Sequence, residues 1–126
     1  MELASYSDSE ILAIIEPLMD NMLAGSTEID HAKHVRDFTH RLKVIVTEDN
    51  LSRQCEDYQK RLGYFKKREI VSIFRRSHSI AAVWRLWYTK SDDEYVCEAM
   101  FVERDGKLLI EHCMIFKSGR LALPHQ

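Results

Sequence analysis

The chain has 126 residues, of which 45% are hydrophobic and 30% are charged, and its formal net charge is −2 at pH 7. This length and composition predict a single folded domain spanning residues 1–126 and exclude a disordered chain. The near-neutral charge gives no general attraction to nucleic acid or to an anionic membrane, so neither is expected as a partner.

The N-terminal residues and the cysteines both bear on the cellular compartment. The first ten residues, MELASYSDSE, carry acids where a signal peptide would need basic residues, and the longest apolar run, ILAII, is too short to span a membrane. The three cysteines, Cys55, Cys97 and Cys113, form no CxxC pair and leave an odd number, which favours reduced thiols. We therefore expect a cytoplasmic protein.

The first helix is expected to be capped by one of residues 7–9, which are Ser, Asp and Ser. Pro17 lies inside its apolar pattern and predicts a kink or break near Glu16, and Gly25 predicts the end of the helix. The apolar positions that define this helix recur at helical spacing, namely Ile11, Ile15, Leu18 and Met22.

Two further helices are predicted before the chain changes character. Ser26 or Thr27 would cap a second helix that contains HAKHVRDFTHR (31–41), the segment richest in titratable side chains. Thr47 would cap a third helix that runs to about Leu62 and ends at Gly63. The buried stripe expected for the second helix consists of Val35, Phe38, Leu42 and Ile45.

The second half of the chain is rich in β-branched and aromatic residues. It contains four predicted strands, at residues 68–76, 80–89, 94–103 and 107–116. The connections between them are so short that neighbouring strands must be antiparallel. The predicted fold is therefore α+β, with three N-terminal helices packed on a curved four-stranded antiparallel meander.

A two-residue turn at Asp105-Gly106 lets the faces of the sheet be assigned. It would pair Arg104 with Lys107 and Ala99 with His112. One face then has the larger apolar area, and we expect the helices to cover it. Its predicted members include Ile70, Ser72, Phe74, Trp84, Tyr88, Tyr95, Cys97, Phe101, His112, Met114 and Phe116.

The opposite face is also unusually apolar for a surface. A monomer rarely exposes so much contiguous apolar area, so we expect a homodimer that forms through the sheet. The residues predicted for this dimer face are Arg85, Trp87, Val96, Glu98, Met100 and Val102.

The segment FTHRLKVIVTEDNLSRQCEDYQKRLGYFKKREIVSIFRR (38–76) and the ending DGKLLIEHCMIF resemble parts of a known superfamily. The first resembles the Phe-x-x-x-Leu…Thr-(Glu/Pro)-(Asp/Glu)…Leu-Gly-x-Phe segment of uncharacterised bacterial members of the nuclear transport factor two-like superfamily, also called SnoaL-like or cystatin-like. The resemblance covers most of residues 9–116. It implies a cone with an internal cavity and frequent dimerisation through the sheet.

That superfamily includes isomerases, dehydratases, cyclases and many non-catalytic binding domains, so the resemblance does not decide the function. Members with ketosteroid isomerase chemistry need a carboxylate base in the pocket and a tyrosine-based oxyanion site. Here the covered face has no carboxylate in the middle of its strands, which counts against that chemistry.

The histidines of residues 31–41 are read mainly as part of a solvated helix face. His31, His34 and His40 lack the i, i+4 spacing of a helical zinc site, so no metal is expected, and no cofactor is expected either. His31 and Phe38 share the buried stripe and would approach the cavity mouth. The basic residues within 60–76 are read as a solvated edge rather than a phosphate or nucleic-acid site.

His112 is the candidate acid or base, because it would lie mid-strand on the covered face near Tyr88, Tyr95 and Cys97. The structural alternative, a hydrogen-bonded core histidine, is the reading we favour for this residue. A nucleophilic Cys97 beside it is the less favoured reading of that thiol. The full predicted ligand pocket consists of His31, Phe38, Ser72, Trp84, Tyr88, Tyr95, Cys97, Phe101, His112 and Met114.

These observations predict a domain that binds a small, largely apolar molecule between its helices and its sheet. The first alternative is a SnoaL-like enzyme of the isomerase, dehydratase or cyclase type that uses His112, so the question of catalysis stays open. The second alternative is a protein-interaction module that acts through the outer face of the sheet.

Overall fold

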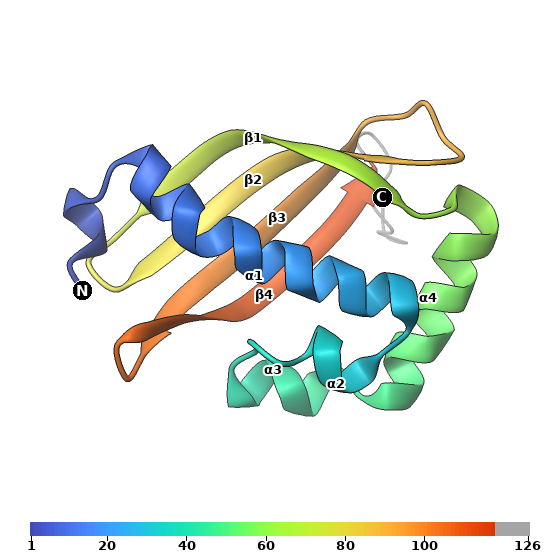
Figure 1. The fold of residues 1–126 in the computed structure, drawn as a ribbon, viewed down its shortest axis with the longest axis horizontal. Helices are drawn as coiled ribbons and strands as arrows, with labels where there is room; N and C mark the ends of the chain where they lie inside the picture. The colour runs from blue at the N-terminus through green and yellow to red at the C-terminus, as the bar shows by residue number, and fades with distance from the viewer. Residues whose placement is uncertain (118–126) are drawn as a thin grey trace, which may run out of the picture.

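The structure, a computed structural model, describes residues 1–117, so residues 118–126 of the expected domain lie outside it. Helices precede strands along the chain, and Figure 1 shows α1 crossing one face of the sheet while α4 stands at one end of it. The elements are η1 (Leu3–Ser5), α1 (Asp8–Glu28), α2 (His31–His34), α3 (His40–Ile45), α4 (Glu48–Leu62), β1 (Phe65–Arg75), β2 (Ser79–Tyr88), β3 (Tyr95–Arg104) and β4 (Lys107–Lys117).

The four strands form one antiparallel meander in the order β1-β2-β3-β4. The predicted fold class, α+β with N-terminal helices on a four-stranded antiparallel sheet, is confirmed. Figure 1 shows that the sheet stays open and is not strongly curled, so the expected cone takes the form of a twisted sheet with helices over one face. The core between the two layers includes Ile11, Ile15, Met19, Ile80, Trp84, Phe101 and Ile110.

Helix α1 continues past both residues that were expected to interrupt it. Ser7, one of the three predicted candidates, caps it: its side chain accepts from the Glu10 N–H, and the Glu10 carboxylate accepts from the Ser7 N–H. The helix contains Pro17 and Gly25 and stops only at Ile29, whose φ of 53° is left-handed. The expected break and the expected stop are therefore wrong, because burial of one helix face against the sheet outweighs the local cost of proline and glycine.

Gly25 does not end a helix; it allows α1 and α2 to pack closely against each other. A Cβ atom built on Gly25 would lie 2.5 Å from the backbone N of His34 and 2.6 Å from its Cα. Only glycine lets α2 pass this close to α1. The backbone of His34 is thereby held directly against α1.

The second predicted helix is interrupted, because residues 37–39 pair with the edge of the sheet. The Ile110 N–H donates to the Asp37 carbonyl (2.8 Å), and the Thr39 N–H donates to the Ile110 carbonyl (2.9 Å). The free backbone groups of β4, an edge strand, compete successfully with the helix. Thr39 then caps α3 through a bond from the Leu42 N–H, and the expected Thr47 cap and Gly63 end of α4 are confirmed.

Two β-bulges change the faces that were predicted from strict alternation. The Asp105-Gly106 turn pairs Arg104 with Lys107 as expected, but a bulge follows, so that Met100 pairs with His112 and not Ala99. An extra residue in one strand moves every later side chain to the other face. The second bulge lies between Ile70 and Ser72. Together they place Ser72, Phe74, His112, Met114 and Phe116 on the outer face, and Ile73, Cys113 and Ile115 on the covered face.

The bulge in β4 has a visible cause at Glu111, the residue without a partner on β3. The Thr39 hydroxyl donates to Glu111 Oε1 (2.6 Å), and Arg41 Nε lies 3.3 Å from the same oxygen. The segment that interrupts the second predicted helix therefore also holds the bulge. These contacts lower the pKa of Glu111, with the bond from Thr39 as the largest cause.

Candidate functional site

A cavity of about 500 Å³ lies at the end of the sheet next to α4, between the helices and the covered face. This volume is within the range of small-molecule sites. Its inner wall is mostly apolar and buried. The wall includes Met22, Leu23 and Ser26 from α1, Phe38, Leu42, Leu51, Cys55 and Tyr58 from the other helical segments, and Phe65, Tyr88, Tyr95, Cys113 and Ile115 from the strands.

The mouth of the cavity is marked by its solvent-exposed lining residues. Gln54, Asp57 and Arg61 lie along one side of α4, and Lys117 lies at the end of β4. Arg61 Nη2 lies 2.8 Å from Asp57 Oδ2, and this pair lowers the pKa of Asp57. The charged lining residues thus stand at the entrance, whereas the deeper wall carries uncharged groups.

Four aromatic rings from four different elements form one side of the cavity. Tyr58 of α4 lies with its ring centroid 5.2 Å from that of Phe65 (β1) and 5.9 Å from that of Tyr88 (β2). Tyr88 also meets Tyr95 (β3) edge to face at 5.0 Å. Such pairs are stabilising beyond their buried area and hold each ring in a defined orientation. The cavity therefore has a rigid aromatic wall.

A small hydrogen-bonded group connects α1 to α4 inside the cavity. The Ser26 hydroxyl lies 2.8 Å from the Tyr58 hydroxyl and 3.2 Å from Cys55 Sγ. Gln59 Nε2 donates to the backbone carbonyls of Ser26 and Thr27. Burial raises the pKa of both Cys55 and Tyr58, so both are protonated and uncharged at neutral pH.

His34 contributes an uncharged ring to the same cavity. Its Nδ1 lies 2.8 Å from the Met22 carbonyl, which can only accept, so Nδ1 carries the proton and Nε2 has the lone pair. The ring stacks edge to face on Phe38 at 5.2 Å. Burial lowers the pKa of His34, which keeps the imidazole neutral at pH 7.

The structure brings only some of the predicted pocket residues into the cavity. Phe38, Tyr88 and Tyr95 line it. Trp84, Cys97 and Phe101 are fully buried in the core, and His31 bonds to the Val46 carbonyl at 2.8 Å. Ser72, His112 and Met114 lie on the outer face, because the bulges shift both strands.

The placement of His112 is the main correction to the predicted site. Its Nε2 lies 3.2 Å from Glu98 Oε2 on the outer face, on the opposite side of the sheet from the cavity. His112 therefore cannot act as an acid or base on a molecule in the cavity, and it cannot activate Cys97, which points into the core. Both the enzymatic reading and the core reading of His112 fail on this geometry.

Sequence reasoning missed most of the helical wall. Leu51, Cys55, Tyr58 and Leu62 recur at four-, three- and four-residue steps, a pattern that does indicate a buried stripe on α4. His34 had no comparable signal. It enters the cavity because the chain turns at residues 35–39 to reach β4, which no helical wheel of residues 26–46 can show.

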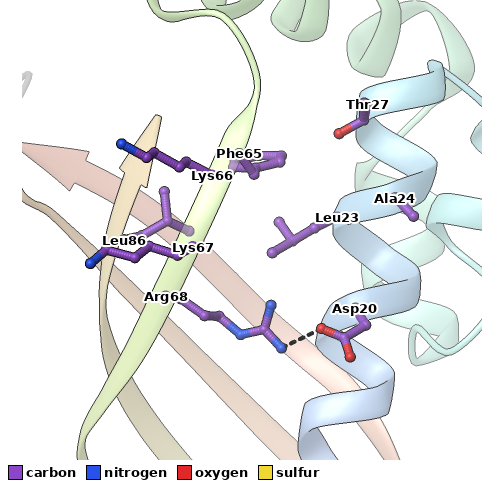
Figure 2. A pocket seen from close by; sticks show the side chains of 9 residues that line it. All are labelled: Asp20, Leu23, Ala24, Thr27, Phe65, Lys66, Lys67, Arg68 and Leu86. Carbon is purple, nitrogen blue, oxygen red and sulfur yellow. Dashed lines mark hydrogen bonds and ion pairs between the residues drawn. The ribbon is translucent and has the colours of Figure 1, made fainter. Parts of the chain in front are cut away.

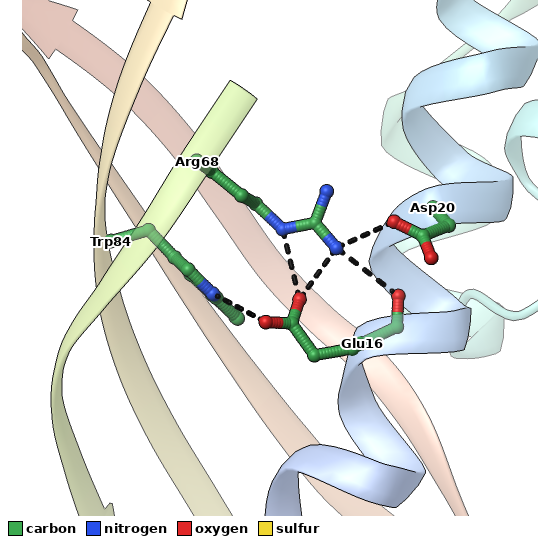
Figure 3. A network of polar contacts seen from close by, with 4 residues as sticks. All are labelled: Glu16, Asp20, Arg68 and Trp84. Atoms are coloured by element: carbon green, nitrogen blue, oxygen red, sulfur yellow. Dashed lines mark hydrogen bonds and ion pairs between the residues drawn. The ribbon is translucent and has the colours of Figure 1, made fainter.

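A second, smaller pocket of about 240 Å³ lies between α1 and β1. Figure 2 shows Arg68 reaching across it toward Asp20, whereas Lys66 and Lys67 point away from α1. Figure 3 shows that Arg68 also binds Glu16, which accepts from Trp84 Nε1 at 3.4 Å. The inward basic group is thus neutralised by two carboxylates, which leaves this pocket poorly suited to an anion.

The two histidines of α2, His31 and His34, each use one ring nitrogen in a hydrogen bond to a backbone carbonyl. Within residues 1–117, no group of three or more His, Cys, Asp and Glu side chains is arranged to hold a metal ion. In the same part of the chain, no helix combines the length and the apolar character needed to cross a membrane.

Comparisons with known proteins place the fold but not the function. No protein-family model matches the chain, and no curated protein matches it. A solved structure of Bd1075 from Bdellovibrio bacteriovorus is similar in fold, with a TM-score of 0.52 and 10% sequence identity over 85% of this chain. The chain corresponds to 40% of the length of that protein. At this identity the likeness concerns the fold alone.

Proposed function

We propose that this domain binds a small, largely apolar molecule in the cavity beside α4. The observation that carries the proposal is the cavity itself, about 500 Å³ in volume, with buried apolar and aromatic walls and a charged mouth. A concave apolar site with a few polar groups is the usual form of a small-molecule site.

We further infer that the domain is a member of the nuclear transport factor two-like superfamily. The order of helices followed by a four-stranded meander supports this assignment, and so does a cavity between the two layers. The likeness to Bd1075 adds a fold match but no activity.

The proposed function can be tested by filling the cavity from one side of β4. Cys113 lines the cavity, whereas the next residue, Met114, points to the outer face. Cys113→Phe should therefore abolish binding of small bicyclic compounds, and Met114→Phe should leave it unchanged. The measurement is an NMR titration of both variants and the wild type. Equal binding by all three would contradict the proposal.

A second function is favoured by the outer face of the sheet, which no helix covers within residues 1–117. Phe74 and Met100 lie in one row across this face and are 60% and 44% exposed, and Met114 in the next row is 49% exposed. We propose that a second copy of the chain covers it. Two polar groups of this face have partners within one chain: Glu98 Oε2 lies 3.2 Å from His112 Nε2, and Arg85 Nε lies 3.6 Å from Glu94 Oε1. These polar groups therefore keep hydrogen-bond partners of their own when a second copy covers the face.

A further inference from the structure

The Tyr88 hydroxyl is an unpaired polar group inside the cavity. Tyr88 is 5% exposed and lines the cavity, yet its hydroxyl forms no hydrogen bond within residues 1–117. In that part of the chain, Arg75 Nε is the one side-chain polar atom that is both sealed from solvent and unpaired. The Tyr88 hydroxyl is therefore not sealed. Because the residue is buried, the space it reaches is the cavity.

Tyr58, the tyrosine of the helical wall, behaves differently. The Tyr58 hydroxyl lies 2.8 Å from the Ser26 hydroxyl and 3.4 Å from Gln59 Nε2, so it is satisfied within the protein. Buried hydroxyls normally have such partners, because an unpaired one loses its bonds to water without replacement. Tyr88 thus keeps a free hydrogen-bonding capacity at a position where water or a ligand must supply the partner.

The surroundings of this hydroxyl determine which partner suits it. Burial raises the pKa of Tyr88, with smaller contributions from the neighbouring Tyr58, Cys97, Tyr95 and Cys113 side chains, so the hydroxyl stays protonated. Contact with the Cys97 thiol and burial also raise the pKa of Cys113 on the same wall. The charged lining residues Asp57, Arg61 and Lys117 stand at the mouth. An ionised group placed deep in the cavity would therefore lose its hydration without meeting a counter-charge.

We propose that the Tyr88 hydroxyl is the recognition group of the cavity and that it donates a hydrogen bond to an uncharged oxygen atom, such as a ketone or ether oxygen, on a ring-containing apolar ligand. This inference rests on the proposed function, because it names the ligand class of the same cavity. The rings of Tyr58, Phe65 and Tyr95 fix the Tyr88 ring and form the wall against which the apolar body of the ligand packs.

The inference can be tested with two probes that differ by one oxygen, tetralin and α-tetralone. Tyr88→Phe keeps the ring and removes the hydroxyl. The ratio of the tetralin to the α-tetralone dissociation constant should fall by about three- to tenfold in this variant, which is the usual range for one neutral hydrogen bond. Tetralin itself should bind both proteins alike. The measurement is an NMR titration of each probe against each protein.

Tyr64→Phe is the matched control, because the Tyr64 side chain is 49% exposed and does not line the cavity. It should change neither the ratio of the two dissociation constants nor the urea midpoint of unfolding, and Tyr88→Phe should leave the midpoint unchanged or higher. An unchanged ratio in Tyr88→Phe would overturn the inference while leaving the proposed function intact. Tighter binding of the anion 2-naphthoate than of α-tetralone would also overturn it. Failure of the wild type to bind any probe would overturn both.

Discussion

Arg68 of β1 joins the sheet to α1 through Glu16. Its Nε lies 2.9 Å from Glu16 Oε1, and its Nη2 also donates to the Glu16 backbone carbonyl at 3.2 Å, one residue before Pro17 (Figure 3). The Arg68 side chain is only 14% exposed, and the second oxygen of Glu16 accepts from Trp84. Arg68 is therefore held by an acceptor that is itself partly buried, and the pair fixes α1 over the sheet beside the smaller pocket.

Two carboxylates of α1 bind Arg68, and they should differ greatly in their contribution to stability. Asp20 accepts from Arg68 Nη2 at 2.6 Å, but its side chain is 70% exposed. Glu16→Ala should lower the free energy of unfolding by about 2–3 kcal/mol, because it leaves a buried guanidinium poorly paired. Asp20→Ala should cost less than about 1 kcal/mol. Urea denaturation of both variants tests this, and equal losses would show that burial does not set the strength of these bonds.

The sequence was sufficient to predict helix ends and turns that depend only on residues close together in the chain. The Thr47 cap, the Gly63 helix end and the Asp105-Gly106 turn all depend on neighbouring residues, and all were predicted; the cap of α1 was narrowed to residues 7–9, and Ser7 supplies it. The bulge at Glu111 depends on Thr39, which is 72 residues away. No local pattern carries that information, so the faces of β4, and with them the place of His112, could not be predicted.

Gly25 is another position whose role depends on a contact that the local sequence does not show. Its residue type predicted a helix end, whereas in the structure it lies against the backbone of His34. Ala in place of Gly usually stabilises a helix by about 1 kcal/mol. Here the added Cβ would meet the backbone of His34, so Gly25→Ala should instead destabilise by about 1–3 kcal/mol. Ala24→Gly at the preceding position should show the ordinary propensity loss of about 1 kcal/mol. A more stable Gly25→Ala variant in urea denaturation would refute the close approach.

His34 should make stability depend on pH below neutrality. Burial lowers the pKa of His34, so between that lowered pKa and the ordinary histidine pKa of about 6.5 the unfolded chain binds a proton that the folded chain does not. The contribution of a neutral His34 to the free energy of unfolding is then fully present above pH 6.5. It is lost as the pH falls from 6.5 toward the lowered pKa of His34. His34→Asn keeps an N–H for the Met22 carbonyl but cannot titrate. Its loss of stability between pH 7 and pH 5, measured by urea denaturation, should be smaller than that of the wild type, and an equal loss would exclude this role.

The proposed pairing of outer faces predicts a dimer at micromolar concentration. Met100→Glu places a charge in the middle of the exposed apolar row and should weaken association by at least about tenfold. Arg53→Glu, on the exposed side of α4, should leave the dimer intact. Sedimentation equilibrium measures both. A wild-type chain that stays monomeric over this concentration range would rule out the pairing.

The location of a bound molecule tests the central claim most directly. Intermolecular nuclear Overhauser effects should be measured on the protein saturated with α-tetralone. The account predicts contacts from the probe to the Leu51 and Ile115 methyl groups and to the Tyr88 ring, which line the cavity. Contacts to the Met100 and Met114 methyl groups instead would place the binding surface on the outer face and contradict the account.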